Sequence, residues 1–150
     1  MRVSVLAVFL FGALGLLVEL WLEGHYEGPW QPIPLGLLGV ALGVGAACIR
    51  GTGRRRHATL RVVTIGLIAA GLLGLLLHYR GNVEFERELS PALRGWGLFR
   101  EAVGGATPTL APGALIELGL LGWIYGYRHP ASTRGETSPA DGRPAVARGE

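Results

Sequence analysis

The sequence predicts an all-α fold: an integral membrane four-helix bundle with a short amphipathic interfacial helix in its long outer loop. Two observations carry this prediction. Four apolar stretches each approach the roughly 20 residues that a helix needs to cross the bilayer core; they are Val3–Leu22, Ile33–Ile49, Val62–Leu77 and Leu110–Tyr127. In addition, 49% of the residues are hydrophobic, and a water-soluble fold of 150 residues has no room to bury four such stretches.

The composition agrees with a membrane protein of bacterial origin. Many of the 25 glycines lie inside the apolar stretches, where glycine is more frequent than in soluble helices. All 14 basic residues are arginine, which fits a GC-rich bacterial genome. The pI of about 9.6 is explained better by membrane orientation and anionic lipid than by nucleic acid, because the arginines are dispersed over loops and tail.

The first apolar stretch is interpreted as a retained span and not as a cleaved signal peptide. Its apolar part is longer than the usual signal region, and the residues that follow, Leu20-Trp21-Leu22-Glu23, are too bulky for a cleavage site. The first domain of the chain is therefore the four-span segment 1–130. The segment 131–150 has no apolar periodicity and is predicted to be a disordered tail.

The arginines predict the orientation. Ten of the 14 fall on one side of the four stretches, five of them between Arg50 and Arg61. The positive-inside rule then places both termini in the cytoplasm of a bacterial cell and the protein in the inner membrane. Gly24–Pro32 and His78–Pro112 are the expected outer loops.

The second outer loop is predicted to contain a helix. Ser90-Pro91 is a typical helix start, and Gly104-Gly105 a typical end. Between them one apolar face recurs every three or four residues, at Leu93, Trp96, Phe99 and Val103. This helix either lies on the outer interface or caps the bundle.

Glu117 stands out because it lies inside the fourth stretch, about 10 Å from its start at 1.5 Å per residue. Ionisable residues at such depth are costly and usually face the protein interior or a water-filled cavity. Its neighbours one turn away are apolar, so we expect it to face the bundle and to find its partner on another helix or in water. The simpler alternative is a neutral glutamate that hydrogen-bonds a neighbouring backbone.

The predicted topology brings several ionisable residues to the outer half of the bundle. Such histidine and carboxylate sets suit Zn, Fe or Mn, so a divalent transition metal is one cofactor to consider. A structural polar cluster and a proton or ion path are the alternatives. The candidate residues are Glu19, Glu23, His25, His78 and Glu117.

Small residues spaced four apart predict close helix packing, within one chain or between copies. The second stretch carries Gly39 and Gly43, and the fourth carries Gly122 and Gly126. A bulky residue at Gly122 is therefore expected to weaken the bundle.

Three segments, Gly24–Leu38, Leu77–Glu86 and Gly105–Gly122, resemble a group of small uncharacterised four-span bacterial membrane proteins. The resemblance covers most of the spans and outer loops and leaves out the tail. It implies a membrane protein of bacterial origin and carries no activity with it.

No nucleophile–base pair, nucleotide-binding loop or zinc-type Cys/His pattern is visible in the sequence, so no catalytic residues are predicted. The expected function is a non-enzymatic accessory or scaffold protein that acts through helix packing and its outer loop. Its expected partners are the lipid bilayer and a membrane protein or a second copy, and not nucleic acid. The alternative is a metal-, proton- or ion-handling protein that uses the outer Glu/His group.

Overall fold

The computed structural model describes residues 2–51, 53–105 and 110–127, and every regular element in these ranges is an α-helix. The predicted all-α class is thus confirmed for the described residues, while the predicted tail lies outside them. The helices are α1 (Arg2–Leu22), α2 (Pro32–Ile49), α3 (Arg54–Leu89), α4 (Gly95–Val103) and α5 (Leu110–Gly126).

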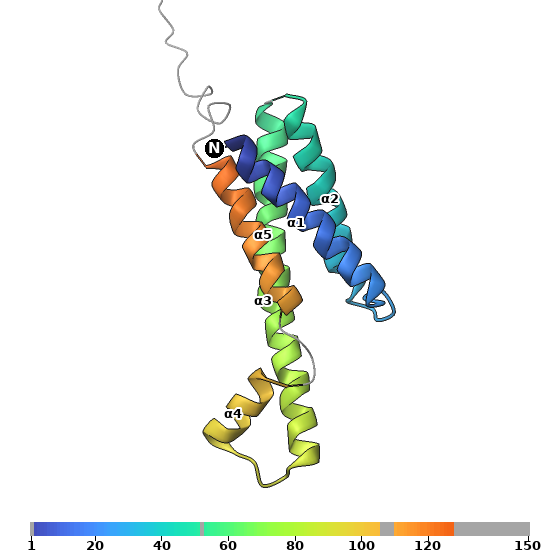
Figure 1. Ribbon diagram of the computed structural model, residues 1–150, viewed down its shortest axis with the longest axis vertical. Helices are drawn as coiled ribbons and strands as arrows, with labels where there is room; N and C mark the ends of the chain where they lie inside the picture. The colour runs from blue at the N-terminus through green and yellow to red at the C-terminus, as the bar shows by residue number, and fades with distance from the viewer. Residues whose placement is uncertain (1, 52, 106–109, 128–150) are drawn as a thin grey trace, which may run out of the picture.

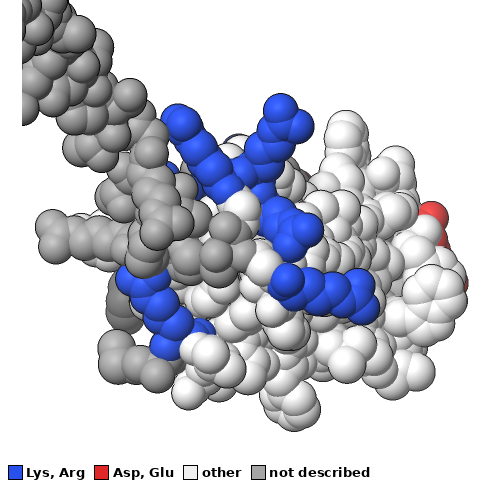
Figure 2. All heavy atoms as spheres, turned by 90° about the horizontal axis from the view of Figure 1, so that it is seen from above, with Lys and Arg blue, Asp and Glu red and all other residues white. Residues whose placement is uncertain are grey.

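Four of the helices form a bundle. α1, α2, the first half of α3 and α5 run alternately up and down, and α3 makes its most extensive contact with α5 (Figure 1). The start of α1, the connection from α2 to α3 and the end of α5 share one end of the bundle, which we call the basic end. Figure 2 looks onto this end, where arginine side chains gather, Arg50 and Arg54 among them. The opposite end, near His25 and His78, is called the histidine end.

Three helices, α1, α2 and α3, are long and apolar enough to cross a membrane. α5 is apolar as well but has only 17 residues. α2 opens with Pro32 in its first turn, where the missing N–H costs no hydrogen bond.

The bundle buries one face of each helix, and the opposite face of α1 is just as apolar. On α1 the buried face includes Phe9, Ala13 and Leu16, at a spacing of three to four residues. Phe11 and Leu14 lie on the other side and are 80% and 52% exposed. A helix that is apolar all round is typical of a protein core or of a membrane span.

Glycines bring α3 and α5 into close contact. A Cβ added to Gly71 would lie 2.6 Å from the backbone oxygen of Pro112, and one added to Gly119 would lie 2.8 Å from that of Thr64. Real Cβ atoms essentially never approach so closely. The two backbones can therefore pack this tightly only because both positions are glycine.

The third helix is much longer than predicted. The sequence prediction ended the helix at Leu77 and placed a loop from His78 onward, but α3 continues to Leu89 and has 36 residues, about 54 Å. Ser90 ends this helix instead of starting the next one: its N–H donates to the carbonyl of Glu86. The prediction failed because the end of an apolar stretch does not end a helix.

The second half of α3 and the short α4 form a projection beyond the bundle, which we call the arm (His78–Val103; Figure 1). α4 packs on α3 through buried Leu98 and Ala102, and the side-chain amide of buried Asn82 donates to the carbonyl of Ala102 at 2.9 Å. A helix lies in part of the predicted segment but begins at Gly95, and Trp96 and Phe99 of the predicted apolar face are 76% and 42% exposed, with Phe99 in ring contact with Tyr79 of α3.

Candidate functional site

A cavity of about 730 Å³ lies between α1, α2, α3 and α5 at the histidine end. Its walls are apolar, with Leu20, Ala70, Leu77 and Leu115 contributed by three different helices. Five polar side chains also line it: Glu19, Glu23, Gln31, His25 and His78. This volume falls within the roughly 300–1,000 Å³ typical of ligand sites.

The end of α1 positions two of the polar residues. Gly24 takes a left-handed conformation (φ 69°), its N–H donates to the carbonyl of Trp21, and the N–H of His25 donates to that of Leu20. This is the Schellman arrangement that ends helices at a glycine. It turns the chain back over the end of the helix, so His25 lines the same cavity as Glu23, the last residue before the turn.

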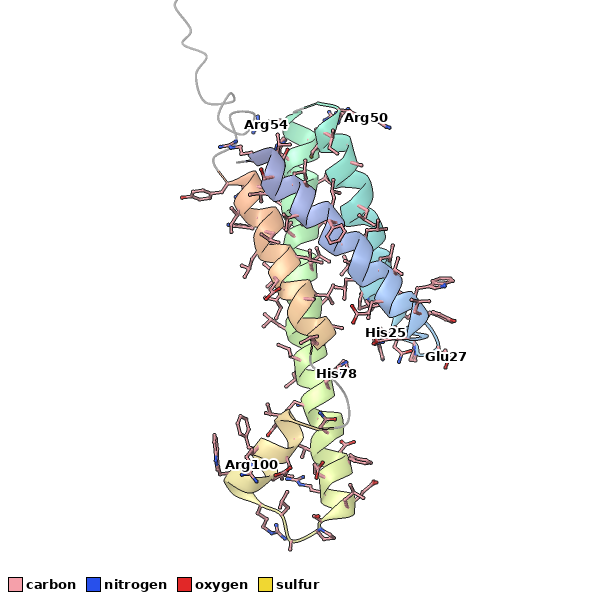
Figure 3. The ribbon with its side chains drawn as sticks, viewed as in Figure 1. His25, Glu27, Arg50, Arg54, His78 and Arg100 are labelled. Atoms are coloured by element: carbon pink, nitrogen blue, oxygen red, sulfur yellow. The ribbon has the colours of Figure 1, made fainter. Side chains whose placement is uncertain are left out.

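His78 reaches the cavity from α3, one residue beyond the apolar stretch Val62–Leu77. Its Nδ1 atom is buried and has no hydrogen-bond partner among the described residues. Burial lowers the pKa of His78, the charge of nearby His25 lowers it further, and Glu23 opposes both effects. The imidazole is therefore held toward its neutral form, in which one ring nitrogen accepts a hydrogen bond. Figure 3 shows His25 and His78 at this end of the molecule, on separate elements.

A second cavity of about 580 Å³ shares His25, Gln31 and His78 with the first. Trp30 and Ile33 are among its own lining residues. Both histidines thus border two adjoining hollows.

Glu117 does not join this group, which corrects the prediction that it faces the bundle interior. Its side chain is exposed, and it does not line the cavity. α5 turns Leu115, Leu118 and Gly122 inward, so Glu117 falls on the opposite side of the helix. The structure therefore separates Glu117 from the other four candidate residues, and within the described ranges no three His, Cys, Asp or Glu residues lie close enough together to hold a metal ion.

Of the predicted glycine contacts, those on α5 are present within the chain and those on α2 are not. A Cβ added to Gly122 would collide with Thr64 and lie 3.1 Å from Phe9, and one added to Gly126 would lie 3.5 Å from Arg61. Gly39 and Gly43 are exposed, and a Cβ at either would meet nothing within 4 Å. Within one chain the expected packing is absent there, because α2 turns the opposite face, which includes Leu38, Ala41 and Gly45, toward the bundle.

The basic end also contains a buried histidine that is not among the predicted site residues. His57 is only 2% exposed and stacks on Tyr125, with ring centroids 5.9 Å apart. Beside it, the guanidinium of Arg56 donates to the carbonyls of Ala47 and Gly51, which ties the start of α3 to the end of α2. The spacing of the sequence could have indicated this burial, because His57 precedes the buried Leu60 of α3 by three residues and so lies on the same helix face.

No family model matches this chain, and neither does a curated protein or a solved structure. Function is therefore inferred from the chemistry of its own residues. Two features could bind another molecule: the cavity at the histidine end, which Glu and His side chains line, and the arm, which carries exposed aromatic side chains.

Proposed function

We propose that this chain is a non-enzymatic accessory or scaffold protein of the bacterial inner membrane, with the bundle in the bilayer and the arm outside it. The observation that carries the proposal is the length of α3. Its 36 residues extend about 54 Å, whereas the hydrocarbon core of a bilayer is about 30 Å thick. The part left over, with α4 packed on it, is a rigid platform held at a fixed distance from the membrane.

The membrane placement rests on the apolar outer faces of the bundle. α1, α2 and α3 have the length and composition of spans, and their outward side chains are largely apolar. α5 is short for a span, but it packs along the apolar part of α3 from Thr64 to Gly71 and so shares its depth. Together they make a four-span bundle.

Charge supports the orientation. The basic end carries Arg2, Arg50 and Arg54–Arg56, and none of the described acidic residues lies at that end. Arginine-rich ends of spans stay in the cytoplasm. Both chain termini then lie inside, and the arm lies outside.

The arm has the surface expected of a binding platform. Trp96 and Phe99 stack with ring centroids 5.1 Å apart, and Tyr79 adds a second ring contact to Phe99. Trp96 and Phe99 remain 76% and 42% exposed, and the Arg100–Glu101 ion pair follows them on α4. Exposed aromatic groups bordered by charge are enriched at the centres of protein interfaces.

The test is photo-crosslinking in native membranes from a probe residue placed at Val103, which is 49% exposed on α4. We expect a discrete crosslinked protein, whose yield falls at least about tenfold in Trp96→Ala/Phe99→Ala, because truncating interface aromatics commonly costs 2 kcal/mol or more. Phe11→Ala is the matched control, since Phe11 is exposed on α1 and lies in the proposed bilayer. If the double variant crosslinks as well as the parent, the aromatic face is not the platform.

A second function is favoured by one observation: Glu19, Glu23, His25 and His78 share a single cavity. We propose that this cavity takes up a cation. The two carboxylates supply negative charge, and the walls are too wide apart for direct ligation by three residues, so the cation is held with its water shell. Mn²⁺ is a suitable probe, because carboxylate and imidazole groups both suit it.

Equilibrium dialysis of the purified protein against Mn²⁺ is expected to show one weak, salt-sensitive site. Glu19→Gln/Glu23→Gln should weaken binding by about tenfold or more, because each carboxylate contributes about 1 kcal/mol in a water-exposed site. Glu27→Gln is the control: Glu27 lies near His25 in the loop between α1 and α2 (Figure 3) but is not among the residues that line the cavity. Equal losses in the control and in the double variant would show that the loop attracts cations non-specifically.

A further inference from the structure

The outward face of α5 combines a heptad-like spacing with a lone acidic residue. Its side chains project away from α1 and α3, and Leu110, Leu120 and Ile124 are 78%, 49% and 58% exposed. Glu117 lies in the middle of this face and is also exposed. The members of the face, spaced alternately by three and four residues, are Leu110, Gly113, Glu117, Leu120 and Ile124.

If α5 lies in the bilayer, this arrangement leaves a carboxyl group directed at lipid. Intramembrane ionisable side chains face protein or water in nearly all cases, because hydrocarbon offers no hydrogen bonds. Other polar side chains of the bundle have different surroundings: Glu19 and Glu23 line the cavity, and Thr64 donates to the carbonyl of Arg61. Among the described residues the structure gives Glu117 no hydrogen-bond or ion-pair partner, which directs the search for one to a second chain.

We propose that two copies of this chain pair through the outward faces of their α5 helices, around a twofold axis that passes between the two Glu117 side chains. The proposal rests on the membrane placement given above and names the partner as a second copy. It makes Glu117 the polar contact at the centre of a dimer interface.

A second copy fits because the carboxyl group is self-complementary. A protonated carboxyl donates one hydrogen bond and accepts others, so two of them facing each other satisfy both without any further residue. A twofold interface brings each residue near its own equivalent. Polar side chains that hydrogen-bond across helices hold membrane helices together in this way.

The spacing of the residues on this face, and the presence of Gly113 there, also fit the packing of two α5 helices. Alternation of three and four residues is the period of two helices that pack with a left-handed crossing, because it keeps one seam facing the partner. Gly113 lies one turn before Glu117, and a Cβ there would meet nothing within 4 Å. A second helix can therefore approach α5 closely at the level where the carboxyls must meet.

The competing face is on α2, where Gly39 and Gly43 are exposed and have open space around them. This face has small residues but no polar group that needs a partner, so nothing drives it to pair. The two faces lie on different helices, and disulfide crosslinking distinguishes them.

The test uses single cysteines in a Cys48→Ser background, oxidised in native membranes. Leu120→Cys lies on the α5 face, and Val40→Cys, 51% exposed on α2, is the matched control. We expect a crosslinked dimer from Leu120→Cys and none from Val40→Cys. Adding Glu117→Leu should lower the dimer fraction by about three- to tenfold, whereas Glu117→Gln should retain it, because an amide also donates and accepts.

Three outcomes overturn the proposal: a dimer that forms equally well with Glu117→Leu, a dimer that forms through Val40→Cys alone, or no dimer from Leu120→Cys. Alkaline carbonate extraction of the same membranes separates this failure from a failure of the proposed function. Protein that stays in the membrane without crosslinking refutes only the dimer. Protein that is released by carbonate refutes the membrane placement itself.

Discussion

Gly119→Leu is expected to separate α5 from α3 and to destabilise the bundle by about 3 kcal/mol, the upper end of what overpacking commonly costs. The reason is that the added side chain meets backbone: the carbonyl oxygen of Thr64 and the backbone nitrogen of Ile68 lie 2.8 and 3.1 Å from the position of a Cβ on Gly119. Backbone in a helix cannot rotate away as a side chain can. Gly122→Leu is expected to be destabilising too, with Thr64 and Phe9 side chains in its path.

Thermal unfolding in detergent, followed by circular dichroism, measures this effect. The matched control is Gly39→Leu, because its Cβ position is open and its helix face is exposed. The control should melt close to the parent, and Gly119→Leu several degrees lower. A Gly119→Leu variant that melts with the parent would mean that α3 and α5 do not pack at this distance.

The helical core could be predicted because apolar stretches of this length leave few alternatives. Of the four predicted spans, the structure places helices of span length and composition at the first three, and a shorter apolar helix at Leu110–Gly126. The gathering of Glu19, Glu23, His25 and His78 at one end also follows from chain order alone. Alternating helices bring the end of one and the second half of another to the same level.

What the sequence could not supply is which face of each helix turns inward. Glu117 and Gly39 were both expected at contacts, yet both are exposed. On α5 and α2 nearly every position is apolar or small, so periodicity does not distinguish a bundle face from a lipid face. The inward face is decided by tertiary contacts, such as Gly119 against Thr64.

The arm was missed for a different reason. The predicted end of the third helix was placed where the hydropathy falls. Hydropathy, however, indicates which part of a helix is apolar enough for a membrane core, and not where the helix ends. Beyond Leu77 no proline occurs before Pro91, so nothing in the chain breaks α3 until Ser90. The burial of Asn82 against α4 could not be foreseen, because it depends on the return of the chain 20 residues later.

We propose that the bundle crosses a membrane with the arm on one side and the chain termini on the other. Cysteine labelling with a membrane-impermeant maleimide, in a Cys48→Ser background, tests it most directly. Ser90→Cys, exposed at the end of α3 in the arm, and Ser132→Cys, in the C-terminal tail, are the two probes.

If the bundle crosses the membrane in this way, the two probes should differ completely, because the hydrocarbon core excludes a charged reagent. In intact cells Ser90→Cys should be labelled fully, and Ser132→Cys should be labelled only after the cells are permeabilised. Labelling of Ser132→Cys from outside intact cells, or protection of Ser90→Cys there, would contradict the proposed topology.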